Sequence, residues 1–202
     1  QLEDGELCCL VETYPAKHDT YEDYLKTLKI AYLYGKTVTL ANTHWPETNA
    51  LMLKNRRIGL SQTGVVQAFN KFGRRTMYQW CDNAYEHIKG LDEEYSDWLC
   101  IPRSVRMTSI KPSGTVSLLN GSTPGIHFPE DEYYIRRIRF AKDSQLIEPL
   151  REAGYKIEDD KYSPNTFCVE FPVKEPHFVK GKRDVSMWEQ LEIAAQYQHY
   201  WA

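Results

Sequence analysis

A regular series of apolar residues between positions 74 and 98 constrains the fold more than any other feature of this sequence. The series recurs at alternating intervals of four and three residues: Met77, Cys81, Ala84, Ile88, Leu91, Tyr95 and Trp98. In an α-helix these side chains share one face, which has to be buried. The spacing predicts one helix over residues 74–98. The seam is short for a coiled coil, so we expect this helix to pack against a sheet.

Shorter patterns predict strands and helices that alternate along the chain. Strands are expected over residues 7–13, 106–110, 135–140 and 167–173. Further helices are expected from Asp19 to Gly35, over residues 144–153, and from Ser186 to the chain end. Pro172 should confine the last strand to a sheet edge. Alternating strands and helices indicate the α/β fold class.

Composition excludes several classes of protein. The 202 residues are 42% apolar and 13% aromatic, which is enough to bury a sizeable core. The net charge of −3 argues against a nucleic-acid partner, and no apolar run is long enough for a membrane span. Five cysteines without paired spacing, and no signal-peptide pattern, favour a reducing cytoplasm. No zinc-binding pattern occurs, so we expect no metal site.

The segment 109–121 has the composition of an anion-binding turn. A tight turn through Pro112 and Gly114 should lead into a short helix whose entry carries the hydroxyls of Ser113, Thr115 and Ser117. Unpaired N–H groups at a helix start bind phosphate, and Gly114 permits a close approach to the main chain. The alternative is a simple turn followed by a capped helix, because the tetrapeptide Pro-Ser-Gly-Thr suits both.

Two adjacent cysteines, Cys8 and Cys9, lie in the first expected strand. Side chains alternate along a strand, so only one of the two can face a substrate. Both could equally be small core residues, because free cysteine is among the most buried residue types. Spacing alone leaves this choice open.

Other polar groups have plain structural interpretations. His127 lies near the anion-binding turn, where a hydrogen-bonded structural role is favoured over substrate contact. Arg56 and Arg57 could pair with phosphates, or could end a helix or strand at the surface. The acidic runs 92–94 and 159–160 are expected to be solvated surface.

Three motifs, in the same order, resemble those of ribonucleotide reductases. Residues 109–127 are similar to the substrate-phosphate loop of that family, residues 55–64 resemble a second signature, and residues 5–15 are similar to the stretch with a redox-active cysteine. The resemblance is greatest to the adenosylcobalamin-dependent class II enzymes, particularly the monomeric ribonucleoside-triphosphate reductase type. It runs along most of the chain.

The resemblance implies a fold and a set of site residues. Residues 1–202 would be a single piece, incomplete at both ends, of a ten-stranded α/β barrel. Cys8 would be redox-active, with Cys9 as runner-up because it stands where the family often has asparagine. The phosphate site would comprise Pro112, Ser113, Gly114, Thr115 and Ser117. The partner cysteine and the radical-carrying cysteine would lie outside this chain, so we expect the isolated chain to be inactive.

The resemblance also implies the reaction. Adenosylcobalamin would generate a thiyl radical that takes the 3′ hydrogen of a ribonucleoside di- or triphosphate. The 2′-hydroxyl would leave as water, and thioredoxin or a similar dithiol would restore the cysteine pair. Two other classes remain open: a non-catalytic nucleotide- or phosphate-binding domain with the same loop, and an interaction domain built on aromatic-rich helices.

Overall fold

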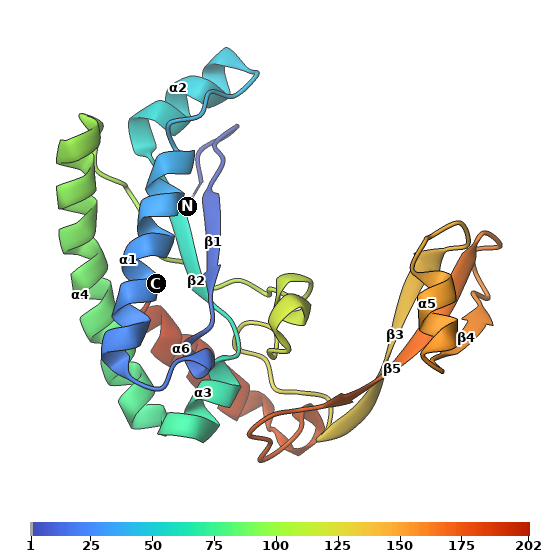
Figure 1. Cartoon of the computed structure of the whole chain (residues 1–202). Coiled ribbons are helices and arrows are strands. Elements are labelled where there is room, and N and C mark those ends of the chain that lie inside the picture. Colours follow the sequence, from blue (N-terminus) through green and yellow to red (C-terminus); the bar gives the residue numbers. More distant parts are fainter. Residues whose placement is uncertain (1) are drawn as a thin grey trace.

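Two parallel strands form the centre of the main body in the computed structural model, which describes residues 2–202. Strand β1 (Cys9–Thr13) pairs in parallel with β2 (Ile58–Gln62), from Cys9 opposite Ile58 to Thr13 opposite Gln62. The predicted strand 106–110 runs along the other side of β2, where it forms one isolated bridge between Thr108 and Leu60. Figure 1 shows α1 and α4 to one side of these strands and the segment around residue 115 to the other.

Six α-helices and three short 3₁₀ helices are found in the described chain. The α-helices are α1 (Tyr21–Val38), α2 (Pro46–Asn55), α3 (Val65–Phe72), α4 (Arg74–Leu99), α5 (Ile147–Glu152) and α6 (Met187–Tyr200). The 3₁₀ helices are Pro15–Lys17, Val116–Asn120 and Lys182–Asp184. The expected start at Ser186 is confirmed, because the Ser186 hydroxyl accepts the Glu189 N–H at 3.2 Å.

The long helix predicted from the apolar seam is confirmed as α4. Its seam residues are buried from Met77 to Tyr95, whereas Trp98 is 66% exposed, so the seam ends one turn earlier than predicted. The expectation of packing on a sheet was wrong in part, because α4 packs mainly against α1, α3 and α6. It reaches the sheet through Cys81, whose Sγ lies 3.5 Å from Gln62 Oε1 at the end of β2.

The prediction that Gly35 ends the first helix was wrong, because α1 continues to Val38. A Cβ at position 35 would lie 3.1 Å from Val11 Cγ2 and 3.2 Å from Ile58 Cγ2. The glycine therefore allows α1 to lie close to both strands. The predicted cap was one residue early, because Thr20 accepts the Asp23 N–H.

Two glycine substitutions in helices should have opposite effects on stability. Gly90→Ala in α4 adds a methyl group in open space, and should raise the free energy of unfolding by about 1 kcal/mol, or about 2–4 °C in Tm. Gly35→Ala forces overpacking against β1 and β2, and should cost about 1–3 kcal/mol. Urea and thermal unfolding of both variants measure the difference. Equal effects would contradict the close packing of α1.

A separate antiparallel sheet stands apart from the main body (Figure 1). It contains β3 (Tyr133–Ala141), β4 (Lys156–Asp159) and β5 (Thr166–Lys174), in the order β3-β5-β4. The expectation that Pro172 marks an edge strand was wrong, because β5 is central. Pro172 pairs with Ile135 of β3, but β4 extends only to Glu170 of β5, so the strand has one neighbour at the proline.

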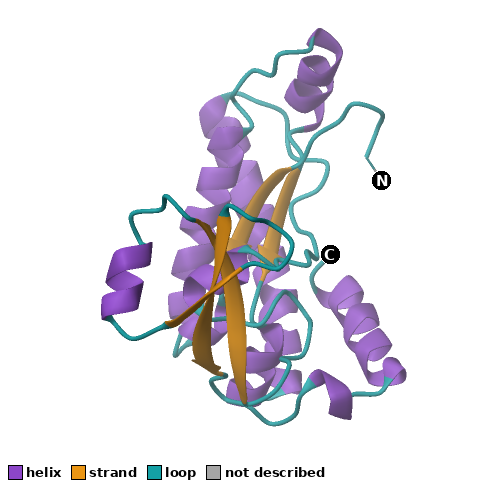
Figure 2. Ribbon diagram, turned by 90° about the vertical axis from the view of Figure 1, so that its right-hand side faces the viewer, coloured by secondary structure: helices purple, strands orange, loops and turns teal. Residues whose placement is uncertain are grey.

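The chain is therefore a mixed α/β structure. Figure 2 shows the antiparallel sheet in front of the parallel pair, and within the described residues the two sheets do not close into a barrel. None of the helices in the described chain has the length and apolar composition needed to cross a membrane.

Candidate functional site

The anion-binding turn expected through Pro112 and Gly114 lies beside the parallel strands. The Ile58 N–H donates to the Arg106 carbonyl and the Leu60 N–H to the Met107 carbonyl. In the other direction, the Ser109 N–H donates to the Leu60 carbonyl. These bonds fix the chain along β2 up to Ser109, after which it turns away from the sheet. The helix that follows is a five-residue 3₁₀ helix, Val116–Asn120. The helix is short, as expected from the sequence, so a helix dipole contributes little here.

Backbone N–H groups are the main donors of this turn. Ser113 has a left-handed φ of 53°. Within residues 2–202, the N–H groups of Gly114, Thr115 and Val116 donate no hydrogen bond. Apart from Gly114 itself and its two neighbours in the chain, no heavy atom lies within 4 Å of where a Gly114 Cβ would be. Successive free N–H groups in a turn form an anion-binding concavity, and this one opens onto free space.

The three hydroxyls predicted to share this site are arranged differently from one another. Thr115 is exposed beside the free N–H groups. Ser113 is buried, and its Oγ donates to Glu12 Oε1 at 2.8 Å. Ser117 is also buried, and its Oγ has no hydrogen-bond partner in the described part of the chain. Pro112 is exposed at the start of the turn. Only the Thr115 hydroxyl is therefore available at the surface of the turn.

Glu12 and Lys111 are polar partners that the sequence analysis did not assign to the turn. Glu12 Oε2 accepts Lys111 Nζ at 2.9 Å, and Glu12 Oε1 also accepts the Thr63 hydroxyl. The Tyr14 hydroxyl donates to the Val116 carbonyl at 3.1 Å. A lysine directly before Pro112 was the available signal, but its acidic partner lies 99 residues away in sequence.

Cys8 lies on the sheet face from which the turn departs. The position that a Gly59 Cβ would occupy is 3.0 Å from Cys8 Sγ, 2.9 Å from Ser109 Oγ and 2.7 Å from Leu10 Cδ2. Gly59 thus leaves room for the sulfur, which is close to Ser109 and so to the start of the turn. Burial raises the pKa of the half-buried Cys8 thiol, and the adjacent Cys9 raises it further.

Cys9 belongs to the opposite face of β1. Alternation places it with Val11 and Thr13. Val11 packs beside Gly35 of α1, and Thr13 Oγ1 lies 3.1 Å from the Tyr24 hydroxyl of the same helix. Cys9 therefore faces the helical layer, away from the turn. Burial raises the pKa of its thiol as well.

The two arginines considered as phosphate partners are engaged elsewhere. Arg56 is buried as the C-cap residue directly after α2, and its Nη1 donates to the Thr39 carbonyl. Arg57 Nε donates to Glu6 Oε1 at 2.8 Å. Burial opposes ionisation of Glu6, but hydrogen bonds from Arg57, the Glu3 amide and Asn55 lower its pKa to about 2.

The expectation that Asp92 is solvated was wrong, because the Asp92 carboxylate pairs with the buried side chain of Lys36.

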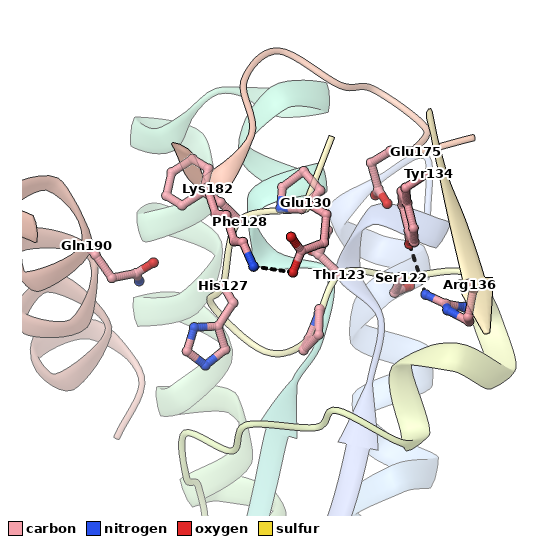
Figure 3. A pocket seen from close by; sticks show the side chains of 12 residues that line it. Ser122, Thr123, His127, Phe128, Glu130, Tyr134, Arg136, Glu175, Lys182 and Gln190 are labelled. Carbon is pink, nitrogen blue, oxygen red and sulfur yellow. Dashed lines mark hydrogen bonds and ion pairs between the residues drawn. The ribbon is translucent and has the colours of Figure 1, made fainter. Parts of the chain in front are cut away.

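A polar cavity of about 320 Å³ lies where β3 and β5 join the main body (Figure 3). Arg136 Nη2 donates to the Tyr134 hydroxyl at 2.9 Å, and Lys182 pairs with Glu130. Burial raises the pKa of Glu175, which accepts a hydrogen bond from Gln67. His127 lines this cavity, and its backbone N–H donates to the Pro124 carbonyl.

Within the described residues no group of His, Cys, Asp or Glu side chains could hold a metal ion.

Comparison with known proteins gives close relatives over the whole chain. It is 53% identical to a probable adenosylcobalamin-dependent ribonucleoside-triphosphate reductase of Dictyostelium discoideum, and 50% identical to the adenosylcobalamin-dependent ribonucleoside-triphosphate reductase of Euglena gracilis. All of the chain is covered in both cases, with 26% and 28% of the relatives. No protein-family model matches the chain.

A solved structure matches in the same way. The crystal structure of a B-12 dependent (class II) ribonucleotide reductase superposes with a TM-score of 0.88 at 31% identity. It covers 100% of this chain and 32% of that protein. The chain thus spans about a quarter to a third of the length of the proteins it matches.

Proposed function

We propose that this chain, which belongs to the family of adenosylcobalamin-dependent (class II) ribonucleotide reductases, forms the reducing and phosphate-binding part of an enzyme that converts ribonucleotides to 2′-deoxyribonucleotides. One observation carries the proposal. The Cys8 sulfur lies beside Ser109, at the start of a turn that presents three free N–H groups. A thiol and an anion site on one sheet face suit a phosphorylated substrate whose sugar is reduced.

The reduction needs two electrons and two protons. A pair of cysteine thiols supplies both when it closes to a disulfide. The ribose loses its 2′-hydroxyl as water, and a C–H bond replaces the C–O bond. Cys8 is one thiol of this pair, and the second comes from a part of the protein outside this chain. Thioredoxin or another dithiol then reduces the disulfide. Cys9 is excluded from this role because it faces α1.

The substrate phosphates bind at Pro112, Ser113, Gly114, Thr115 and Ser117. The N–H groups of Gly114 and Thr115 and the Thr115 hydroxyl make the contacts, while buried Ser113 and Ser117 shape the turn. Strands β1 and β2 and the segment beside β2 are neighbouring strands of the ten-stranded barrel that the whole protein completes. Adenosylcobalamin supplies the initiating radical when bound, and none of the described residues is assigned to it.

Replacing Gly114 tests the phosphate assignment. Gly114→Val fills the open space beside the free N–H groups, and should raise KM for a ribonucleotide by about tenfold or more, since one charge-assisted hydrogen bond contributes about 1.5–3 kcal/mol. The kcat should change little. Gly90→Ala, at another exposed glycine with open space around it, is the matched control. An unchanged KM would remove Gly114 from the phosphate site.

The function itself is tested on the whole protein of which this chain is part. With adenosylcobalamin, a dithiol and a ribonucleoside di- or triphosphate, we expect the corresponding 2′-deoxyribonucleotide, and no product without the cofactor. A non-catalytic phosphate-binding domain uses the same N–H groups but leaves Cys8 without a role. Nucleotide binding with no deoxyribonucleotide formed would favour that second function.

A further inference from the structure

The Glu12 side chain links β1 to the anion-binding turn through hydrogen bonds. It lies on β1, and alternation puts it on the face of Cys8 and Leu10. Its side chain is only 6% exposed. A carboxylate so well shielded from water has to be matched by hydrogen bonds and by opposite charge.

Both carboxylate oxygens of Glu12 are matched, mostly by the turn. Oε2 accepts Lys111 Nζ at 2.9 Å, and Oε1 accepts Ser113 Oγ at 2.8 Å. The third partner, the Thr63 hydroxyl, follows β2 and thereby anchors the carboxylate to the sheet. The turn is therefore fastened to the sheet on both sides of Pro112.

The position of Ser113 decides where the free N–H groups point. Ser113 has a φ of 53°, which non-glycine residues seldom adopt without support. Its hydroxyl is held by Glu12, and its carbonyl accepts the Ser117 N–H at 3.0 Å. The N–H groups of Gly114, Thr115 and Val116 lie between these two bonds. Loss of the Glu12 contact would let this segment relax to other backbone conformations.

We infer that Glu12 is a positioning residue: its carboxylate, through Ser113 and Lys111, holds the turn in the conformation that binds substrate phosphate. Glu12 does not touch the substrate. It also neutralises Lys111, so the turn attracts an anion through its N–H groups rather than through a free ammonium group. This inference rests on the proposed function and deepens it.

The experiment measures inorganic pyrophosphate binding to the whole protein by calorimetry, with KM and kcat for a ribonucleotide in parallel. Glu12→Ala should weaken pyrophosphate binding and raise KM by about tenfold with little change in kcat. Glu12→Gln keeps an acceptor for Ser113 and should recover most of the affinity. Glu86→Ala, which removes an exposed carboxylate paired with Lys89 on α4, is the control and should change neither value.

A double variant separates positioning from general destabilisation. If Glu12 acts through Ser113, then Glu12→Ala combined with Ser113→Ala should bind pyrophosphate no more weakly than Glu12→Ala alone. Additive losses, or unchanged binding in Glu12→Ala, would overturn the inference. Wild-type protein that binds pyrophosphate but forms no deoxyribonucleotide would refute the proposed function and leave the positioning role supported by the binding data. Wild-type protein that does not bind pyrophosphate would overturn both.

Discussion

Asp92→Asn is expected to lower the free energy of unfolding by about 3–5 kcal/mol, because it leaves a buried ammonium group without its counter-charge. Asp92 Oδ1 accepts Lys36 Nζ at 2.6 Å and the Tyr32 hydroxyl at 2.7 Å, and Oδ2 accepts the Ser104 N–H at 2.9 Å. Lys36 and Tyr32 belong to α1, and their side chains are fully buried. The carboxylate thus ties α1 to α4.

The loss of unfolding free energy in Asp92→Asn should depend on pH, because it depends on the protonation of Lys36. Burial lowers the pKa of Lys36, and the Asp92 carboxylate opposes that effect. Without the carboxylate the pKa falls further, so the unfolded chain binds more protons than the folded one, and stability rises with pH. The deficit of Asp92→Asn should therefore be smaller at about pH 9 than at pH 7.

Chemical denaturation at both pH values measures this effect. Glu93→Gln is a matched control, because Glu93 is the next residue of the same acidic run and forms an exposed pair with Arg103. Such a pair contributes about 0–1 kcal/mol. A second variant, Lys36→Met with Asp92→Leu, removes both charges and should recover much of the stability. A loss below about 1 kcal/mol for Asp92→Asn would show that the pair is dispensable.

The burial of Asp92 also shows what could not be predicted from the sequence pattern alone. The seam of α4 could be predicted, because apolar residues at helical spacing have to be buried whatever covers them. Asp92 follows Leu91 of that seam and lies three residues before Tyr95, so it is at the edge of the buried face. Its partner Lys36 is 56 residues earlier. Three consecutive acidic residues look like surface unless that partner is known.

The residues of the candidate site could be proposed from the sequence, but the contacts that orient their side chains could not. The segment 109–121 was predicted to contain an anion-binding turn through Pro112 and Gly114, and the N–H groups of residues 114–116 donate no hydrogen bond in the structure. The inward orientation of Ser113 could not be predicted, because it depends on Glu12 from another strand. Alternation separates Cys8 from Cys9, but only the packing of α1 shows which of them faces the helices. Tertiary contacts therefore decided both choices.

In the whole protein, Cys8→Ser should abolish multiple turnover with a dithiol reductant while leaving nucleotide binding intact. A serine hydroxyl cannot form a disulfide, so the two electrons needed for reduction of the sugar have no source at this position. The substitution changes one atom beside Gly59 and Ser109, so the turn that holds the phosphates keeps its geometry. In this variant the affinity for the ribonucleotide should therefore be unchanged, while its multiple turnover is lost.

Cys9→Ser is the matched control, because it makes the same change on the opposite face of β1. It should retain turnover, since Cys9 shares the side of Val11 and Thr13 that packs on α1. Deoxyribonucleotide formed over many turnovers, together with binding of the unreacted nucleotide, measures both variants. Full multiple turnover in Cys8→Ser, or its loss in Cys9→Ser alone, would refute the redox role of Cys8. Burial raises the pKa of both thiols, so alkylation rates cannot replace turnover in distinguishing them.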